Sequence, residues 1–210
     1  MKAVGLFSGG KDSLYAVYLA EKQGVEVDHL LTLIPSLPWP SPHAENIEAL
    51  KILADSMGKH LTIVDFQRPA AFIEALKSLE VDALVAGDIY VEAHVAGLKD
   101  VCSKVGLTLL EPLYRRDTLE LFHEIFGLGF KALITGVNLK DLGEEWLGFV
   151  ISKETGDNFL SKIGSVDPLG ENGEFHTLVI DCPLYAKSFK VKCVERKTAK
   201  GMTYLNVSIG

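Results

Sequence analysis

Residues 8–13 read Ser8-Gly9-Gly10-Lys11-Asp12-Ser13, and they follow directly on an apolar run at residues 3–7. The two adjacent glycines let several backbone N–H groups converge on one anion. The N-terminus of a following helix adds a partial positive charge, and Lys11 adds a full one. A strand, a glycine turn and a helix in this order predict a phosphate-binding loop. The chain is therefore expected to work on a nucleotide.

The spacing within this loop excludes two common nucleotide motifs. Gly5 to Lys11 fits the Walker A spacing G-x-x-x-x-G-K, but Asp12 stands where Walker A needs Ser or Thr to bind magnesium. The dinucleotide motif G-x-G-x-x-G is absent because Gly9 and Gly10 are adjacent. The pattern Ser-Gly-Gly-x-Asp-Ser instead resembles the PP-loop ATP pyrophosphatases. In that superfamily the loop binds the β- and γ-phosphates of ATP, which leave as pyrophosphate. The alternative is a glycine turn in an unrelated α/β protein.

The composition indicates a reduced protein without a metal or disulfide framework. The 210 residues carry a net charge of −7, which argues against a nucleic-acid partner, because such a protein presents a basic face. The three cysteines form no C-x-x-C pair, as is typical of the cytoplasm. No stretch reads as a signal peptide or a transmembrane helix. We therefore expect a cytoplasmic protein with no membrane partner and no direct nucleic-acid binding.

Short apolar runs alternate with segments of helical spacing in the first two-thirds of the chain. The runs are continuous, which predicts strands that are buried on both faces of a parallel sheet. They cover residues 3–7, 27–34, 61–66, 83–86, 107–110 and 132–135. Helical spacing leads into Gly24 and Gly58, where we expect helices to end. The pattern predicts an α/β domain with a doubly wound parallel sheet over residues 1–138.

Beyond residue 138 this alternation is lost. Three further strands with polar turns are predicted at residues 177–180, 189–196 and 203–209, with a hairpin loop at residues 197–201. We therefore expect a smaller C-terminal α+β domain over residues 139–210. The proline-rich segment 35–43 follows the second predicted strand, and a binding loop and a stiff connection are equally compatible with it.

A second concentration of chemistry occupies residues 167–177, which read Asp-Pro-Leu-Gly-Glu-Asn-Gly-Glu-Phe-His-Thr. The glycines beside Glu171 and Glu174 predict a turn that approaches a ligand closely. Its carboxylates are of the type that holds magnesium, accepts protons or binds a cation. On the residues alone, a solvated acidic turn is the simpler interpretation. The histidines at positions 29, 60, 94, 123 and 176 lack metal-ligand spacing, so we expect them to be ordinary surface or core residues.

Several motifs together resemble the diphthine–ammonia ligase family of PP-loop enzymes. Besides residues 8–13, they are Gly-Glu-x-Gly-Glu-aromatic-x-Thr at 170–177, Ala-Gly-Asp-Ile at 86–89, Glu-Pro-Leu-Tyr at 111–114 and Glu-Trp-Leu-Gly at 145–148. The similarity covers residues 3 to 185. It implies an adenine nucleotide alpha hydrolase-like fold for the doubly wound sheet.

The resemblance also implies roles for individual residues. The ATP-binding residues would be Ser8, Gly9, Gly10, Lys11, Asp12, Ser13, Gly87 and Asp88. The acceptor-binding residues would be His43, Glu171, Gly173, Glu174 and Thr177. Catalysis would fall to Lys11, Asp12, Glu171 and Glu174. Asp12 is also the candidate ligand of Mg²⁺.

The implied reaction is ATP-dependent amide formation. A carboxylate is adenylated, pyrophosphate leaves, and ammonia then displaces AMP. The resemblance implies diphthine on elongation factor 2 as the acceptor, in diphthamide biosynthesis. A chain of 210 residues has no room for a glutaminase domain, so ammonia would arrive free or from a partner. The sequence leaves a homodimer open.

Three positions depart from the family pattern. Val95, Gly97 and Phe149 stand where the family often has arginine. An arginine that pairs with a carboxylate is not replaced by Val or Phe without loss of orientation and charge. Another small carboxylic acid is therefore an alternative acceptor. A nucleotide-binding sensor without catalysis is the alternative from a different class.

Overall fold

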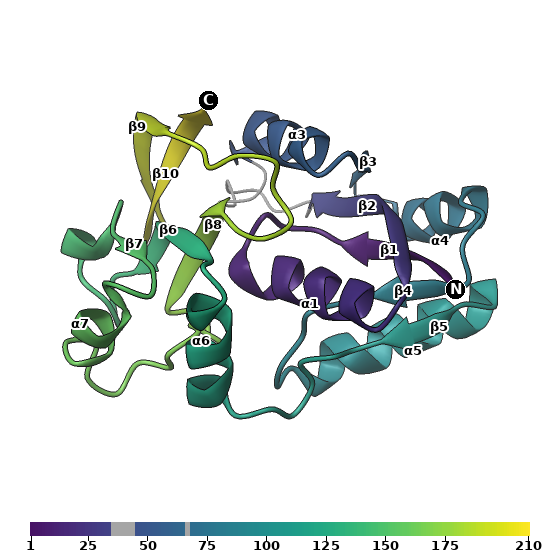
Figure 1. Ribbon diagram of the computed structural model, residues 1–210, viewed down its shortest axis with the longest axis horizontal. Coiled ribbons are helices and arrows are strands. Elements are labelled where there is room, and N and C mark those ends of the chain that lie inside the picture. The colour runs from purple at the N-terminus through teal and green to yellow at the C-terminus, as the bar shows by residue number, and fades with distance from the viewer. Residues whose placement is uncertain (35–44, 66–67) are drawn as a thin grey trace.

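The structure is a computed structural model, and it describes residues 1–34, 45–65 and 68–210. The candidate residue His43 and the proline-rich segment 35–43 lie outside the described residues. The chain forms two sheets that lie side by side (Figure 1). Within the described residues, no helix combines the length and the apolar composition that crossing a bilayer requires.

A parallel five-stranded sheet occupies the N-terminal half of the chain, in the order β3-β2-β1-β4-β5. This order confirms the predicted doubly wound α/β domain, because the chain winds outward from β1 in both directions. The strands are β1 (Lys2–Leu6), β2 (Glu26–Ile34), β3 (His60–Asp65), β4 (Ala83–Val85) and β5 (Thr108–Leu110). The helices between them are α1 (Lys11–Lys22), α3 (Ile47–Ser56), α4 (Pro69–Ser78) and α5 (Glu92–Val105).

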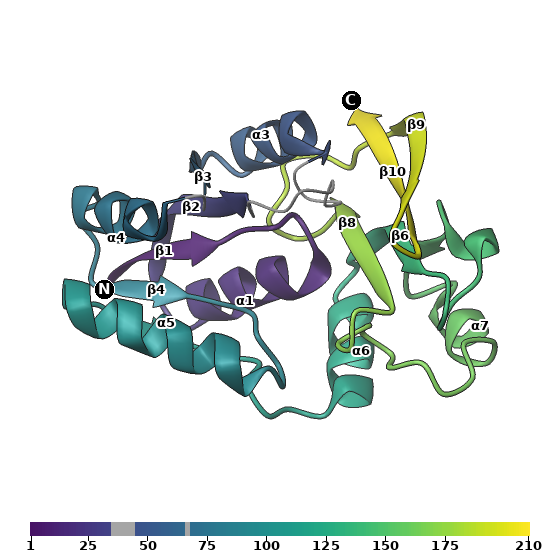
Figure 2. The same cartoon turned by 180° about the vertical axis from the view of Figure 1, so that it is seen from behind.

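Helices cover both faces of this sheet, and Figures 1 and 2 show α1 and α5 on opposite sides of it. In β1, Ala3 packs into the cluster that contains residues of α1 and α3. Its neighbour Val4 packs into the cluster that contains residues of α4 and α5. Successive side chains of a strand point to opposite faces, so burial of both faces explains the continuous apolar runs.

An antiparallel sheet forms the C-terminal half, with β6 at its centre. β6 pairs with β7, β8 and β10, and β9 pairs with β10 at the edge. The strands are β6 (Lys131–Asn138), β7 (Val150–Ile151), β8 (Phe175–Asp181), β9 (Val191–Ala199) and β10 (Met202–Ile209). The helical segments are α6 (Thr118–Gly127), η1 (Glu144–Trp146) and α7 (Gly156–Leu160). The three strands predicted beyond residue 138 are thus confirmed as β8, β9 and β10.

The change from one sheet to the other comes earlier than residue 138. The apolar run 132–135 was expected to extend the parallel sheet, but it lies in β6 of the antiparallel sheet. Six consecutive residues of β6 are buried. A continuous apolar run indicates a buried strand and says nothing of its direction, which is why the pattern misassigned this strand. The passage between the sheets therefore lies between β5 and β6.

The two sheets share one hydrophobic core. Leu14 and Tyr15 of α1 belong to the same cluster of buried residues as Ile134 of β6 and Phe175 of β8. A backbone hydrogen bond of 2.8 Å also runs from the Val179 N–H of β8 to the Gly9 carbonyl. The C-terminal sheet is therefore packed directly against the loop between β1 and α1.

Candidate active site

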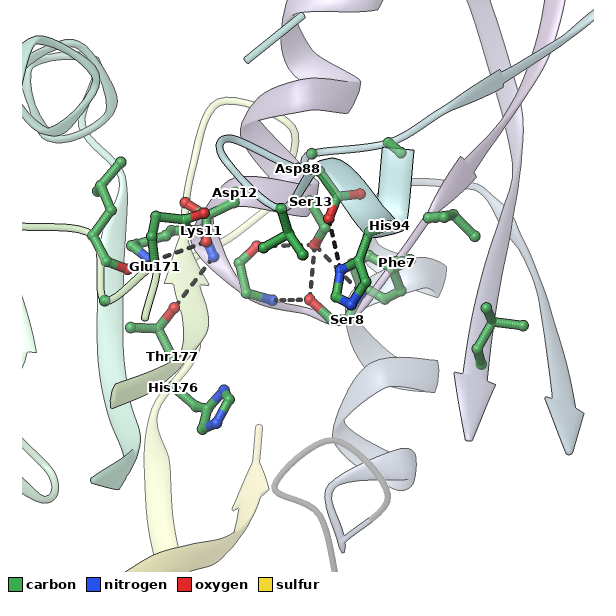
Figure 3. Close-up of a pocket in the computed structure, with 18 of the residues that line it drawn as sticks. Phe7, Ser8, Lys11, Asp12, Ser13, Asp88, His94, Glu171, His176 and Thr177 are labelled. Atoms are coloured by element: carbon green, nitrogen blue, oxygen red, sulfur yellow. Dashed lines mark hydrogen bonds and ion pairs between the residues drawn. The ribbon is translucent and has the colours of Figure 1, made fainter. Parts of the chain in front are cut away.

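A cavity of about 400 Å³ lies at the carboxyl ends of β1, β2 and β4. We call residues 8–13 the glycine loop and residues 167–177 the glutamate loop. Figure 3 shows that side chains of both loops meet here. Of the predicted site residues, the following line the cavity: Ser8, Gly10, Lys11, Asp12, Ser13, Gly87, Asp88, Glu171, Gly173 and Thr177. The structure thus brings together two groups of residues that are more than 150 positions apart.

Hydroxyl groups hold the glycine loop closed. The Ser13 hydroxyl donates to the Gly10 carbonyl over 3.0 Å, and it lies 3.1 Å from the Ser8 hydroxyl. The Ser8 hydroxyl also accepts the Gly10 N–H at 3.3 Å. Gly10 occupies the N-cap of α1 and has no side chain to cap the helix, although the Thr177 hydroxyl accepts the Lys11 N–H at 3.3 Å. A helix N-terminus in this state suits a phosphate.

Two glycines of the site stand where a Cβ atom would lie too close to neighbouring atoms. Gly9 has a φ of +73°, and a Cβ atom there would lie 2.5 Å from the side chain of Leu50. A Cβ atom on Gly87 would lie 2.7 Å from the backbone oxygen of Asp12. Gly87 follows β4, so its lack of a side chain lets β4 end directly against the first turn of α1.

Lys11 and Asp12 form an ion pair at the floor of the site. The Lys11 Nζ lies 2.9 Å from Asp12 Oδ2, and the Lys11 side chain is only 3% exposed. The same ammonium donates to the Leu169 carbonyl and lies 5.2 Å from the centre of the Phe175 ring. Its charge is therefore partly neutralised and is shared with the glutamate loop.

Asp12 offers a carboxylate oxygen that fits a cation. Its Oδ1 atom is buried and has no hydrogen-bond partner among the described residues. The described residues contain no group of three His, Cys, Asp or Glu side chains arranged to hold a metal. Mg²⁺ commonly uses one or two carboxylates together with the phosphates of a nucleotide. The donor set therefore suits Mg²⁺ that arrives with ATP, with Asp12 as its protein ligand.

Glu174 turns away from the cavity and organises the glutamate loop. Its carboxylate accepts the Asn172 N–H at 2.9 Å, the Asn172 side-chain amide at 3.0 Å and the Asp167 N–H at 3.2 Å. Burial raises the pKa of this carboxyl, but these hydrogen bonds outweigh burial and lower it overall. We expected Glu174 to face the acceptor, whereas the structure directs it into its own loop.

Replacement of Glu174 by Gln should lower the free energy of unfolding at pH 7 by about 1–3 kcal/mol, because an amide leaves at least one buried N–H without an acceptor. The folded-state pKa of Glu174 is lowered from 4.5. The stabilisation is therefore present above about pH 4.5 and is lost as the pH falls through the folded-state pKa. Chemical unfolding of both proteins should give curves that converge in acid. A difference that stays constant with pH would contradict this account.

Glu171, three residues earlier, lines the cavity. Burial and the nearby carboxylates of Asp12, Asp167 and Asp88 together raise its pKa to about 8, although Lys11 opposes them. A carboxyl that is mostly protonated at pH 7 and titrates near pH 8 suits proton transfer. The structure therefore separates the two glutamates that the sequence treated alike.

The raised pKa of Glu171 should make the ligand-free protein less stable in alkali. Its folded-state pKa of about 8 lies above the reference value of 4.5. The folded protein therefore binds more protons between these values, so the free energy of unfolding falls as the pH rises from about 5 to 8. The loss should be on the order of 2–4 kcal/mol. Glu171→Gln should lack this loss in chemical unfolding between pH 5 and 9; parallel curves for the two proteins would exclude a raised pKa.

Two histidines that the sequence did not indicate as site residues line the cavity. His94 of α5 places Nδ1 3.1 Å from the Asp88 Oδ1 atom, and His176 lies in the glutamate loop (Figure 3). We expected both to be ordinary surface or core residues. Their positions in the sequence could have indicated a place in the site, because His94 follows Asp88 by six residues and His176 stands within the second motif.

The three positions that lack the family's arginine lie outside the cavity. Val95, Gly97 and Phe149 do not line the cavity as the described residues define it. Val95 is buried. The Phe149 ring packs against Trp146, with 5.0 Å between ring centres, and against Phe159 at 6.1 Å. Phe149 therefore serves the core of the C-terminal half.

Comparison with protein families identifies the chain. The model of the diphthamide synthase N-terminal domain matches residues 1–109, and the model of the C-terminal domain matches residues 117–209. The chain belongs to the diphthamide synthase family. This confirms the resemblance seen in the motifs. The junction between the two diphthamide synthase domains coincides with the passage from the parallel to the antiparallel sheet.

Named relatives cover nearly all of the chain. The diphthine–ammonia ligase of Danio rerio is 26% identical over 229 residues, which cover 93% of this chain and 88% of the relative. That of Schizosaccharomyces pombe is 27% identical over 218 residues, which cover 89% of this chain and 35% of the relative. A solved structure, described as a predicted subunit of a tRNA methyltransferase from Methanocaldococcus jannaschii, is 20% identical. It has a TM-score of 0.47 and covers 87% of this chain and 98% of its own. The assignment to the diphthamide synthase family depends on the sequence matches alone.

Proposed function

We propose that this protein is a diphthine–ammonia ligase that uses ATP to convert a carboxylate into an amide. One observation carries the proposal: the glycine loop and Glu171 of the glutamate loop line the same cavity. A nucleotide phosphate and an acceptor carboxylate would therefore meet within one site. Membership of the diphthamide synthase family and the named relatives support diphthine as the acceptor.

The glycine loop would bind the phosphates of ATP. The N-terminus of α1 and the Lys11 ammonium would stabilise the charge that develops on the leaving pyrophosphate. The acceptor carboxylate attacks the α-phosphorus, and the bond from this phosphorus to the bridging α–β oxygen breaks. Its electron pair leaves with pyrophosphate. Asp88 and Gly87, which follow β4, would lie beside the nucleoside.

Glu171 would act in the second half of the reaction. Ammonia attacks the acyl carbon of the adenylate, and the bond from this carbon to the AMP oxygen breaks with departure of AMP. The attacking nitrogen must lose a proton. Glu171 lines the cavity, and its pKa of about 8 allows it to take that proton in its ionised form.

The remaining partners belong to the same proposal. Asp12 would hold Mg²⁺, which supplies Lewis-acid neutralisation of the phosphate charge when bound. The protein acceptor would be elongation factor 2, and ammonia would enter free or from a partner protein. All three cysteines are free, which favours action in the reducing cytoplasm.

Turnover of the protein should release AMP and pyrophosphate. Elongation factor 2 that carries diphthine would be incubated with the protein, α-labelled ATP and ammonium. We expect labelled AMP by chromatography and conversion of the carboxylate to an amide by mass spectrometry. Omission of ammonium is the control, since amide should then be absent.

Other products would change the assignment in defined ways. Acceptor-dependent ADP and phosphate would exclude PP-loop chemistry. AMP formation with another small carboxylic acid, but not with diphthine, would make that acid the acceptor in place of diphthine. ATP binding without any pyrophosphate release would favour a nucleotide sensor.

A further inference from the structure

The side chain of Lys11 joins two loops that meet at the cavity. Although Lys11 begins α1 in the glycine loop, its Nζ donates to the Leu169 carbonyl of the glutamate loop and pairs with Asp12 at 2.9 Å. A lysine ammonium has three N–H donors. The described residues accept hydrogen bonds from two of them. The third has no acceptor among the described residues, and Lys11 lines the cavity.

We propose that Lys11 couples nucleotide binding to the position of Glu171: its ammonium holds the Leu169 carbonyl on one side and a phosphate oxygen on the other. This rests on the proposed function, because it requires a nucleotide phosphate in the cavity. A phosphate that takes the third N–H fixes the ammonium, and the fixed ammonium orders the loop at Leu169.

Hydrogen bonds extend this constraint from Leu169 to Glu171. The Asp167 Oδ1 atom accepts the Leu169 N–H at 2.8 Å and the Glu171 N–H at 3.4 Å. The other Asp167 oxygen accepts the Thr118 hydroxyl of α6 at 2.8 Å. Asp167 is therefore anchored to α6, and Leu169 and Glu171 are held in one turn around it. Ordering of Leu169 by Lys11 thus restricts the backbone that carries Glu171.

The other end of the glutamate loop is held without the Lys11 side chain. The Lys11 backbone N–H donates to the Thr177 hydroxyl at 3.3 Å, and the Val179 N–H donates to the Gly9 carbonyl at 2.8 Å. These bonds persist when the Lys11 side chain is replaced. Nucleotide binding should therefore order residues 168–173 through Lys11 and leave residues 177–180 almost unaffected.

Hydrogen–deuterium exchange of the full chain tests this coupling without any acceptor. The probe is an ATP analogue with a methylene group between the α- and β-phosphates, used with Mg²⁺ at saturation. In the wild-type protein the analogue should slow exchange in residues 168–173 by about tenfold, within the usual range of coupling between sites. In Lys11→Met, measured at its own saturation, the slowing should be absent. Residues 177–180 should respond equally in both proteins.

The control variant is Ser13→Ala. Among the described residues its hydroxyl forms hydrogen bonds with Ser8 and Gly10 of the glycine loop, so the variant should bind the analogue more weakly yet keep the slowing at saturation. If Lys11→Met does not fold, Lys11→Gln replaces it, because a shorter neutral amide does not bridge both partners.

The outcomes separate this inference from the proposed function. Binding of the analogue to the wild-type protein without slower exchange in residues 168–173 would overturn the coupling alone. Equal slowing in the lysine variant and the wild-type protein would do the same. Failure of the wild-type protein to bind the analogue would overturn both the proposed function and the coupling.

Discussion

Replacement of Glu171 by Gln should lower the rate of amide formation by about 10²–10⁴-fold, the usual contribution of a general base. Affinity for ATP should stay within a few-fold of wild type. The reason is that the carboxyl, with a pKa of about 8, is mostly protonated at pH 7, and the neutral amide resembles that form in shape and charge. The turnover number with saturating acceptor and the calorimetric affinity for ATP check the two expectations.

The matched control for this variant is Glu120→Gln. Glu120 lies exposed on α6 and does not line the cavity, so its replacement should leave turnover and ATP affinity unchanged. A Glu171→Gln protein that loses ATP affinity in proportion to its activity would make Glu171 a nucleotide or metal ligand. The proposed role as a base would then be withdrawn.

Addition of one methyl group at Gly87 should disrupt the glycine loop. The Cβ atom of Gly87→Ala would lie 2.7 Å and 2.8 Å from two backbone atoms of Asp12, and backbone cannot rotate away as a side chain does. Overpacking of this kind costs about 1–3 kcal/mol of unfolding free energy. Because the displaced segment is the first turn of α1, ATP binding should fall as well. Chemical unfolding and an ATP titration measure the two effects.

Gly97→Ala is the matched control for Gly87→Ala. Gly97 lies within α5, and a Cβ atom there meets nothing within 4 Å. Alanine in a helix interior is more stable than glycine by about 0.5–1 kcal/mol, so this variant should be stabilised and should bind ATP normally. A Gly87→Ala protein as stable as wild type would show that the end of β4 moves freely relative to α1.

The features that follow from neighbouring residues were predicted best. Gly9, Gly10 and Lys11 stand beside each other between a strand and a helix, and the structure has Gly9 at positive φ and α1 beginning at Lys11. The roles of the site residues stay predictions, but the meeting of both loops at one cavity agrees with the family resemblance. No local pattern carries that information, because the meeting depends on the packing of β8 against the glycine loop.

Other features of the fold and the site depend on contacts between groups whose positions in space do not follow from the sequence. Glu171 and Glu174 stand in nearly identical surroundings in the motif, and only the loop's own N–H groups decide that Glu174 turns inward. The apolar run of β6 is as continuous as that of a parallel strand, so the sequence did not reveal that β6 is antiparallel. His94 enters the site because α5 begins just after the end of β4, which brings it to Asp88.

The backbone bond between Val179 and Gly9 has a consequence for synthesis of the protein on the ribosome. The strands of the first sheet can pair soon after residue 110 has been made, but the glycine loop lacks its partner until β8 has left the exit tunnel. Contacts so distant along the chain form late in folding. A nascent chain therefore carries an unfinished nucleotide site for most of its elongation, and the complete pocket is among the last parts of the molecule to form.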